Sequence, residues 1–145
     1  PIAELEGEIE IRRNMIRAGM FEIPRNSLMM ALKESNQMIG VVSCYWIGRE
    51  TNWLAAGLDI YDPEYWGKGI GAEALTLWIT YLFKNYPKIV RLDFQTWSGN
   101  TGMMRLAKKL GFKEEARFRN ARVVNGEYFD AMGYGILREE WENQH

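Results

Sequence analysis

Three glycines alternate in the stretch Gly67–Gly71 (GKGIG), directly before an apolar run that we predict to be a helix. Asp62-Pro63 ends the extended run before it, because proline cannot donate a hydrogen bond to a strand ladder. The first turn of a helix exposes backbone N–H groups that carry partial positive charge, and glycine leaves them open to a ligand. The segment therefore predicts a strand–loop–helix unit that binds a bulky anion such as phosphate or pyrophosphate.

The rest of the chain predicts one mixed sheet. Apolar spacing indicates helices over residues 2–18, Gly69–Tyr86 and Asn100–Leu110, and Asn125-Gly126 between two apolar runs is a strong hairpin signal. The strands on either side of the Gly69–Tyr86 helix should be parallel, joined by a right-handed crossover. We predict an α/β (α+β) fold with these strands: Ser27–Lys33, Met38–Ile47, Asn52–Tyr61, Lys88–Trp97, Ala116–Val124 and Glu127–Leu137.

Length and composition exclude several classes of protein. The 145 residues suit a single domain over residues 1–145, and a net charge of −1 gives no field to recruit nucleic acid or an anionic membrane. No apolar run reaches the roughly 18 residues that a membrane span needs. The lone cysteine, Cys44, cannot form an internal disulfide and suits a reducing compartment, so we expect a cytoplasmic protein. Because His145 is the sole histidine, we expect neither a metal site nor a Ser-His or Cys-His pair.

Two known phosphate-binding designs fit the glycine segment poorly. A P-loop requires Ser or Thr after Gly-Lys, whereas Gly69 follows Lys68 here. The dinucleotide pattern G-x-G-x-x-[GA] matches at Gly67, Gly69 and Ala72, and Asp93 follows at a suitable interval. That design, however, requires a strand leading almost directly into the first glycine, whereas here a proline and an antiparallel meander come first. A dinucleotide site is therefore the weaker alternative.

Three segments together resemble the GNAT acetyltransferases, in particular their RimJ/RimL-like branch. Residues 66–71 (WGKGIG) are similar to the family's acyl-CoA motif R/Q-x-x-G-x-G/A, with Trp66 where Arg or Gln is usual. Residues 100–112 (NTGMMRLAKKLGF) are similar to the branch's N-x-x-x-x-x-L-x-x-K-L-G-F segment, and residues 114–141 to its C-terminal hairpin. The segments occur in the family's order and on the predicted elements.

The resemblance implies a GNAT fold, in which a mostly antiparallel twisted sheet has helices on both faces. Its two central parallel strands, here Asn52–Tyr61 and Lys88–Trp97, would splay apart to admit the pantetheine arm of acetyl-CoA. The family has a further strand and helix upstream, which we expect this chain to lack. The residues that the resemblance assigns to acetyl-CoA are Ile60, Tyr61, Trp66, Gly67, Lys68, Gly69, Ile70, Gly71, Ala72 and Asn100.

The implied reaction is direct attack of an amine on the acetyl thioester. The family recruits a carboxylate near the splay as the base. The candidates here are Asp59 on the first splayed strand and Glu64 or Asp62 at its end, although each could be an ordinary surface carboxylate. The family's usual general acid, a tyrosine seven residues after the asparagine, is replaced by Ala107. Ser98 or water could serve the departing sulfur, with Tyr128 or Tyr134 as weaker alternatives.

Several of these residues have a structural interpretation that stays open. Asn100 suits a helix N-cap as well as a contact to the cofactor, and Trp97 suits the core as well as the wall of an acceptor pocket. Tyr128 is a candidate for the acceptor site. Arg117 and Arg119 could steer an anionic substrate or pair with nearby glutamates.

The sequence therefore predicts an N-acetyltransferase that uses acetyl-CoA without a metal. The branch favours the N-terminal amine of a protein or peptide as the acceptor, with a polyamine, an aminoglycoside or another small amine as the alternative. An acyl-CoA-binding module without turnover remains a further alternative, because the usual tyrosine is absent. A homodimer is compatible with the aromatic-rich composition.

Overall fold

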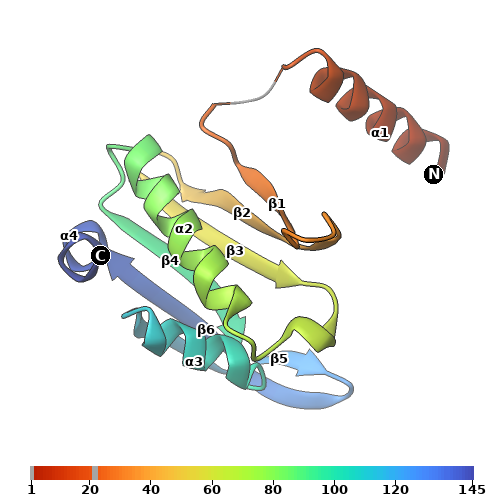
Figure 1. Cartoon of the computed structure of the whole chain (residues 1–145). Coiled ribbons are helices and arrows are strands. Elements are labelled where there is room, and N and C mark those ends of the chain that lie inside the picture. Colours follow the sequence, from red (N-terminus) through yellow and green to blue (C-terminus); the bar gives the residue numbers. More distant parts are fainter. Residues whose placement is uncertain (1, 21–22) are drawn as a thin grey trace.

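Six strands form one mixed sheet in the computed structural model of the chain, which describes residues 2–20 and 23–145 (Figure 1). The strand order is β1-β2-β3-β4-β6-β5, and β3 and β4 are the parallel pair at its centre. All other neighbouring strands are antiparallel. The strands are β1 (Ser27–Ala31), β2 (Met38–Gly48), β3 (Trp53–Ile60), β4 (Arg91–Trp97), β5 (Lys113–Val124) and β6 (Glu127–Leu137).

Three of the four helices lie where the sequence predicts them, and α4 was not predicted. They are α1 (Ile2–Arg17), α2 (Ile70–Asn85), α3 (Thr101–Lys109) and α4 (Arg138–Gln144), with a short 3₁₀ helix, η1, at Pro63–Tyr65. Helix α1 stands apart from the sheet beyond β1, and its described side chains are exposed (Figure 1). The predicted hairpin turn is confirmed, since Asn125 and Gly126 both have positive φ angles, of 50° and 80°.

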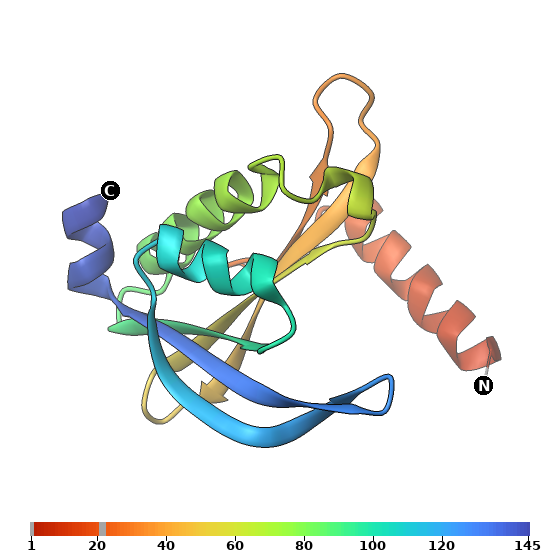
Figure 2. The ribbon, with the colours of Figure 1, turned by 90° about the horizontal axis from the view of Figure 1, so that it is seen from below.

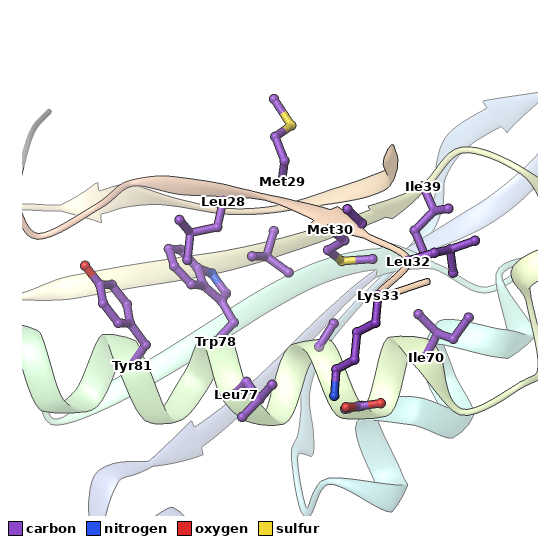
Figure 3. Close-up of a pocket in the computed structure, with 14 residues that line it drawn as sticks. Leu28, Met29, Met30, Leu32, Lys33, Ile39, Ile70, Leu77, Trp78 and Tyr81 are labelled. Carbon is purple, nitrogen blue, oxygen red and sulfur yellow. The ribbon is translucent and has the colours of Figure 1, made fainter. Parts of the chain in front are cut away.

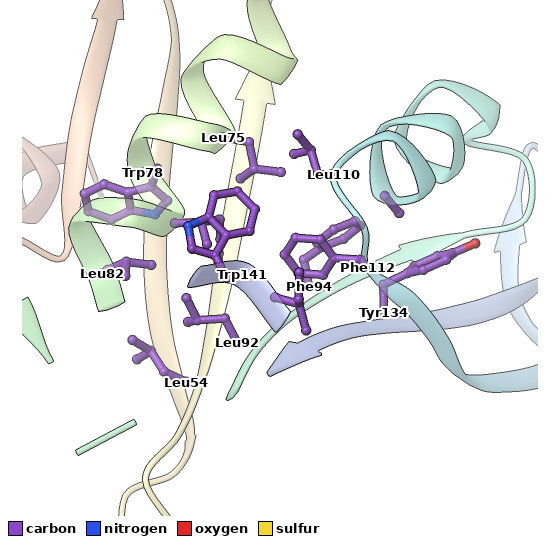
Figure 4. Close-up of a cluster of buried hydrophobic side chains, with 14 of the residues drawn as sticks. Leu54, Leu75, Trp78, Leu82, Leu92, Phe94, Leu110, Phe112, Tyr134 and Trp141 are labelled. Carbon is purple, nitrogen blue, oxygen red and sulfur yellow. The ribbon is translucent and has the colours of Figure 1, made fainter. Parts of the chain in front are cut away.

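The buried core lies between the sheet and its packed helices (Figure 4). Figure 2 shows α2 and α3 next to each other over the sheet. Residues that alternate along the central strands, such as Leu54 and Ala56 on β3 and Leu92 and Phe94 on β4, pack against α2, α3 and α4. Trp141 of α4 closes one end of this core, where its indole donates to the Thr80 hydroxyl. Helices α2, α3 and α4 therefore enclose this core, and the mixed, mostly antiparallel sheet with its helices agrees with the predicted fold class.

The parallel contact between β3 and β4 is short. Their ladder joins Leu54 to Leu92 and Ala55 to Asp93 and then stops. Each strand continues beside its other neighbour, β3 with β2 as far as Ile60 and β4 with β6 as far as Trp97. The two central strands therefore separate beyond Ala55, which confirms the predicted splay (Figure 1).

A polar clamp holds the closed end of the splay, on the face away from α2. We use this name for Trp53, Arg91, Asp93 and Glu115. The Asp93 carboxylate accepts from the Trp53 indole N–H at 2.7 Å and from the Arg91 guanidinium at 2.6 and 2.9 Å. Arg91 also pairs with Glu115 and lies 5.5 Å from the Trp53 ring centroid. The clamp thus ties the first residue of β3 to β4 beside their two ladder pairs.

The clamp predicts a measurable coupling between the two strands. Trp53→Phe removes one hydrogen bond to a mostly buried carboxylate, and Asp93→Asn removes its charge. Because both changes break the same interaction, we expect a coupling free energy of about 1–2 kcal/mol in the cycle of the two single variants and the double variant. Chemical denaturation measures it. Strictly additive losses would show that the indole and the carboxylate stabilise the fold independently.

Candidate functional site

A cavity of about 370 Å³ lies between the separated halves of β3 and β4, and we call it the splay cavity. Its walls come from the part of each strand beyond the last ladder pair, together with β2, the start of α3, one residue of α2 and one residue of β5. The backbone edge of residues 56–60 that faces β4 has no ladder partner there. The lining residues are Ser43, Tyr45, Ala56, Gly57, Leu58, Asp59, Leu75, Phe94, Gln95, Thr96, Trp97, Asn100, Met103 and Arg122.

The glycine loop, Gly67–Gly71, leads into α2 beside this cavity. Gly67 and Gly69 have φ angles of 70° and 83°, a left-handed conformation that side chains other than glycine rarely adopt. A Cβ atom at either position would meet no atom within 4 Å, so space is open above both. Gly69 is the N-cap of α2 and supplies no side chain to cap the first turn. The N–H groups of the first turn therefore face solvent without a capping side chain.

Gly71 has a different role from the other two glycines. A Cβ atom there would lie 3.3 Å from Leu58 and 3.6 Å from both Ile60 and Leu106. The glycine therefore allows α2 to pack closely against the end of β3 and against α3. Since Leu58 also lines the splay cavity, this contact brings the helix start and the cavity together.

Trp66, which stands where the family motif has Arg or Gln, fastens the loop to the sheet. Its indole N–H donates to the Ile60 carbonyl at 3.0 Å, while the ring is 60% exposed. Asp62 caps η1 by accepting from the Glu64 N–H at 2.9 Å. The Lys68 ammonium lies 5.8 Å from the Tyr65 ring centroid, on the exposed loop. These contacts fix the path from β3 to α2, with Tyr61 exposed at its start.

The structure separates the predicted base candidates, of which Asp62 caps η1 and does not line the splay cavity. Asp59 lines the splay cavity from the β3 wall, whereas Glu64 is exposed on η1 and does not line it. Asp59 is therefore the carboxylate that can reach a ligand in the cavity.

Ser98 fastens the end of β4 to β6. Its hydroxyl accepts from the Asp130 N–H at 2.9 Å, and its own N–H donates to the Asp130 carbonyl at 3.0 Å. Ser98 is not among the residues lining the splay cavity. This double contact gives Ser98 a structural role, and the part in proton transfer suggested by the sequence stays a prediction.

Of the remaining predicted residues, Asn100 and Trp97 line the splay cavity and Tyr128 does not. Asn100 caps α3, since its side-chain oxygen accepts from the Met103 N–H at 3.1 Å, and it also lines the cavity. Trp97 forms a wall of the cavity and packs edge-on against Phe129, with ring centroids 4.8 Å apart. Tyr128 is 67% exposed near the hairpin turn and does not line the cavity.

Sequence reasoning missed several residues of the site. Ser43 and Tyr45 on β2 and Gln95 and Thr96 on β4 line the cavity. Polar residues within otherwise apolar central strands were the available signal. Arg122 on β5 also lines the cavity, and no local pattern could place it there, because its position depends on pairing between β5 and β6.

A carboxylate of the hairpin holds a bulge in β5. The ladder with β6 shifts register between Phe118 and Arg122. Asp130 accepts from the Asn120 N–H at 3.1 Å and from the Arg117 guanidinium at 2.9 Å. The hydrogen bond from Arg117, and then that from Asn120, lowers the pKa of the Asp130 carboxyl. Arg117 also pairs with Glu114, which favours the pairing interpretation of this arginine over substrate steering.

Neither Ala107 nor Tyr134 is placed to act as the general acid. Ala107, at the family's tyrosine position, is fully buried in the core. Tyr134 is 1% exposed, and its hydroxyl has no hydrogen-bond partner among the described residues. Burial raises the pKa of the Tyr134 phenol, and the residue does not line the splay cavity. Tyr45 is the tyrosine that does line it.

A larger hollow of about 630 Å³ lies between β1 and α2 (Figure 3). Its walls are mainly apolar, with Leu28 and Met30 of β1 facing Ile70, Leu77 and Trp78 of α2. Its charged lining residues are Lys33 and Glu73. Although it is larger than the splay cavity, it lies at the edge of the sheet and not between the separated central strands.

The structure also bears on the alternative ligands. Asp93, which a dinucleotide site would need for the ribose, is occupied by the polar clamp and buried. Among the described residues, no group of three or more His, Cys, Asp or Glu could hold a metal ion. No helix in the described part of the chain has the length and apolar character to cross a membrane.

Comparison with known proteins decides the family. Residues 5–113 match the family described as "Acetyltransferase (GNAT) domain". The chain belongs to this GNAT family. The resemblance seen in the three sequence motifs is therefore confirmed, and with it the GNAT fold. The curated relatives of this chain are N-acetyltransferases.

The similar proteins include acetyltransferases whose names give different acceptors. The chain is 28% identical over 119 residues to the putative ribosomal N-acetyltransferase YdaF of Bacillus subtilis, covering 82% of this chain and 64% of YdaF. It is 28% identical over 86 residues to the spermidine N(1)-acetyltransferase of Escherichia coli K12, covering 59% and 46%. A GNAT-family acetyltransferase structure from Bacillus anthracis superposes with a TM-score of 0.68 at 26% identity, covering 88% and 74%. The chain thus spans about two thirds of the length of YdaF.

The hydrogen bonds that Asp130 accepts from Arg117 and Asn120 predict a pH-dependent contribution to stability. Because folding lowers the pKa of Asp130 below its ordinary value of 3.8, its contacts stabilise the fold above that pH and are lost as the pH falls through the folded-state pKa. We expect Asp130→Asn to lower the urea midpoint at pH 7, and the difference from the wild type to shrink below about pH 4.

Glu127→Gln is the control for this measurement. Glu127 lies on the same strand and has no ion pair among the described residues. Its substitution should change the midpoint little at either pH. A difference for Asp130→Asn that stays constant from pH 7 to pH 3 would contradict the ion-pair account.

Proposed function

We propose that this GNAT domain, over residues 1–145, transfers the acetyl group of acetyl-CoA to a primary amine. The proposal favours the N-terminal amine of a protein or peptide as the acceptor. The observation that carries it is the splay cavity, whose open β3 edge adjoins the uncapped start of α2. A strand edge without a ladder partner can pair with an amide-containing arm, and a glycine-bounded helix start can receive a pyrophosphate.

The glycine loop fits the charged end of acetyl-CoA. Gly67 and Gly69 leave open space where side chains would otherwise stand, and Lys68 adds a positive charge to the exposed loop. The pantetheine arm would run along residues 56–60 of β3 toward Asn100. The thioester would then lie inside the splay cavity, between the walls formed by Asp59 and Trp97.

The reaction needs a neutral amine beside the thioester. The amine nitrogen forms a bond to the carbonyl carbon, the carbon–sulfur bond breaks, and a proton leaves the nitrogen. Asp59, directly or through water, would take that proton, and CoA would leave as its thiolate or thiol. An α-amine with a pKa of about 8 is roughly a tenth neutral at pH 7, and the neutral fraction of a lysine amine is about two hundred-fold smaller. An N-terminal amine therefore requires less help from a base.

Other parts of the proposal rest on the same site. Tyr45 is the cavity-lining hydroxyl closest in kind to the family's tyrosine, and we propose it as the source of a proton for the departing sulfur. A cytoplasmic location, expected from the lone cysteine, stays a prediction, as does a homodimer. An acyl-CoA-binding module without turnover is the second candidate, favoured by the buried Ala107.

Binding of acetyl-CoA tests the first step. Gly69→Val places a branched side chain over the open amides, and we expect it to weaken acetyl-CoA binding at least about tenfold in calorimetric titration. Gly19→Val is the matched control, since Gly19 also has a left-handed φ, of 68°, and open space at the end of α1. If both variants bind as the wild type does, the pyrophosphate does not lie on this loop.

Thiol release over a panel of amines tests turnover and the base. If Asp59 takes the proton, Asp59→Asn should lower the turnover number by about a hundredfold at neutral pH with little change in acetyl-CoA affinity. Glu64→Gln, on the exposed η1, should leave turnover unchanged. Equal effects of the two substitutions would remove Asp59 from the mechanism. Tight acetyl-CoA binding without thiol release from any amine would instead support the binding module.

A further inference from the structure

Arg122 directly follows the bulge in β5 and lines the splay cavity. Phe118 pairs with Ala131 and Arg122 with Phe129, so residues 119–121 stand opposite Asp130 alone. Ala131 and Phe129 are two residues apart on β6, so their partners Phe118 and Arg122 face the same side of the sheet. Asn120 adopts a left-handed φ of 53° within the bulge, and the Asp130 carboxylate holds its N–H. The pairing of β5 with β6 thus determines which side of the sheet Arg122 occupies.

The guanidinium of Arg122 lies over the ring of Trp97, and its N–H donors are available to a ligand. Its Cζ atom lies 5.9 Å from the centroid of the Trp97 ring, within the range of a cation–π contact. Arg122 has no ion pair with any described residue, whereas Arg117 on the same strand pairs with both Glu114 and Asp130. An arginine without a carboxylate partner keeps its planar donor fork available for a carboxylate of another molecule.

One acidic and one basic side chain line the cavity from different walls. Asp59 on β3 and Arg122 on β5 are its lining residues that are charged at neutral pH, among those the structure describes. A ligand that carries only positive charges would meet a single carboxylate and an opposing guanidinium. A ligand with an amine and a nearby carboxylate would place each group beside a side chain of opposite charge.

We propose that Arg122 selects acceptors that carry a carboxylate close to the reacting amine, as in a peptide with an acidic residue next to its N-terminus. This inference rests on the proposed function and names the substrate class of the same site. Arg122 would bind the carboxylate, and Asp59 would lie on the side of the amine. The same contacts disfavour a polyamine such as spermidine.

Two matched peptides test the proposal, Ser-Glu-Ala-Ala and Ser-Gln-Ala-Ala, alongside free glutamate and spermidine. We expect the wild type to acetylate the Glu peptide with a kcat/KM about tenfold higher than the Gln peptide, mainly through KM. Arg122→Gln should abolish this preference by lowering kcat/KM for the Glu peptide about tenfold relative to the Gln peptide, without changing the KM for acetyl-CoA. Arg122→Lys, which keeps the charge, should restore part of the preference.

Arg119→Gln is the control variant, because Arg119 is exposed on the same bulge and does not line the cavity. It should keep the wild-type preference. Equal turnover of the two peptides by the wild type, an equal loss on both in Arg122→Gln, or spermidine as the better acceptor would overturn the proposal. If free glutamate is acetylated as efficiently as the Glu peptide, the recognised carboxylate is that of a small amino acid and a peptide is not required.

A binding measurement keeps this test separate from the proposed function. Fluorescence anisotropy with both peptides, labelled at the C-terminus, reports Arg122 recognition without turnover. If the Glu peptide binds about tenfold more tightly and Arg122→Gln removes the difference, the inference holds even where no thiol is released. Failure of acetyl-CoA to bind or of any amine to react would reject only the acetyl transfer. Equal binding of both peptides to the wild type would reject the role of Arg122.

Discussion

The short parallel contact between β3 and β4 is the constraint on which the candidate site depends. Two ladder pairs join the strands, and the Asp93 carboxylate adds bonds to Trp53 and Arg91 at the same end. Beyond that point each strand follows its antiparallel neighbour, so the separation does not leave either strand isolated. The splay cavity is therefore a product of strand pairing, and the core beneath it stays continuous through α2 and α3.

The glycine loop and the cavity belong to one unit because α2 packs closely on the end of β3. Gly71 permits that approach, and Trp66 fastens the loop through the Ile60 carbonyl. The three glycines that alternate in the sequence thus divide into two kinds, with Gly67 and Gly69 open to solvent and Gly71 packed. A single pattern in the sequence serves both ligand access and helix docking.

The fold could be predicted from local chemistry to a large extent. Asn125-Gly126 marked the hairpin turn, Gly19 ended the first helix, and the crossover rule made β3 and β4 parallel. The family followed from three motifs in order. Helix α4 was missed, because its formation is supported by burial of Trp141 against distant residues such as Phe112 rather than by a long apolar repeat.

The candidate site was predicted less completely, and for a physical reason. Asp59, Trp97 and Asn100 line the cavity as expected, since each lies at or near the end of a central strand. Glu64 does not line it because it belongs to the exposed 3₁₀ helix, and Tyr128 does not because it lies exposed on β6 next to the hairpin turn. Arg122 depends on the register of β5 against β6, which is a long-range property that no short window contains.

The bulge opposite Asp130 makes the length of the hairpin as important as its composition. Side chains alternate along a strand, so removing one residue from 119–121 would exchange the two sides for every residue between the bulge and Asn125. An amino-acid replacement at these exposed positions does not change the number of residues in the bulge. Among natural variants of this hairpin, single-residue insertions and deletions in 119–121 would therefore change what faces the cavity more than most substitutions do.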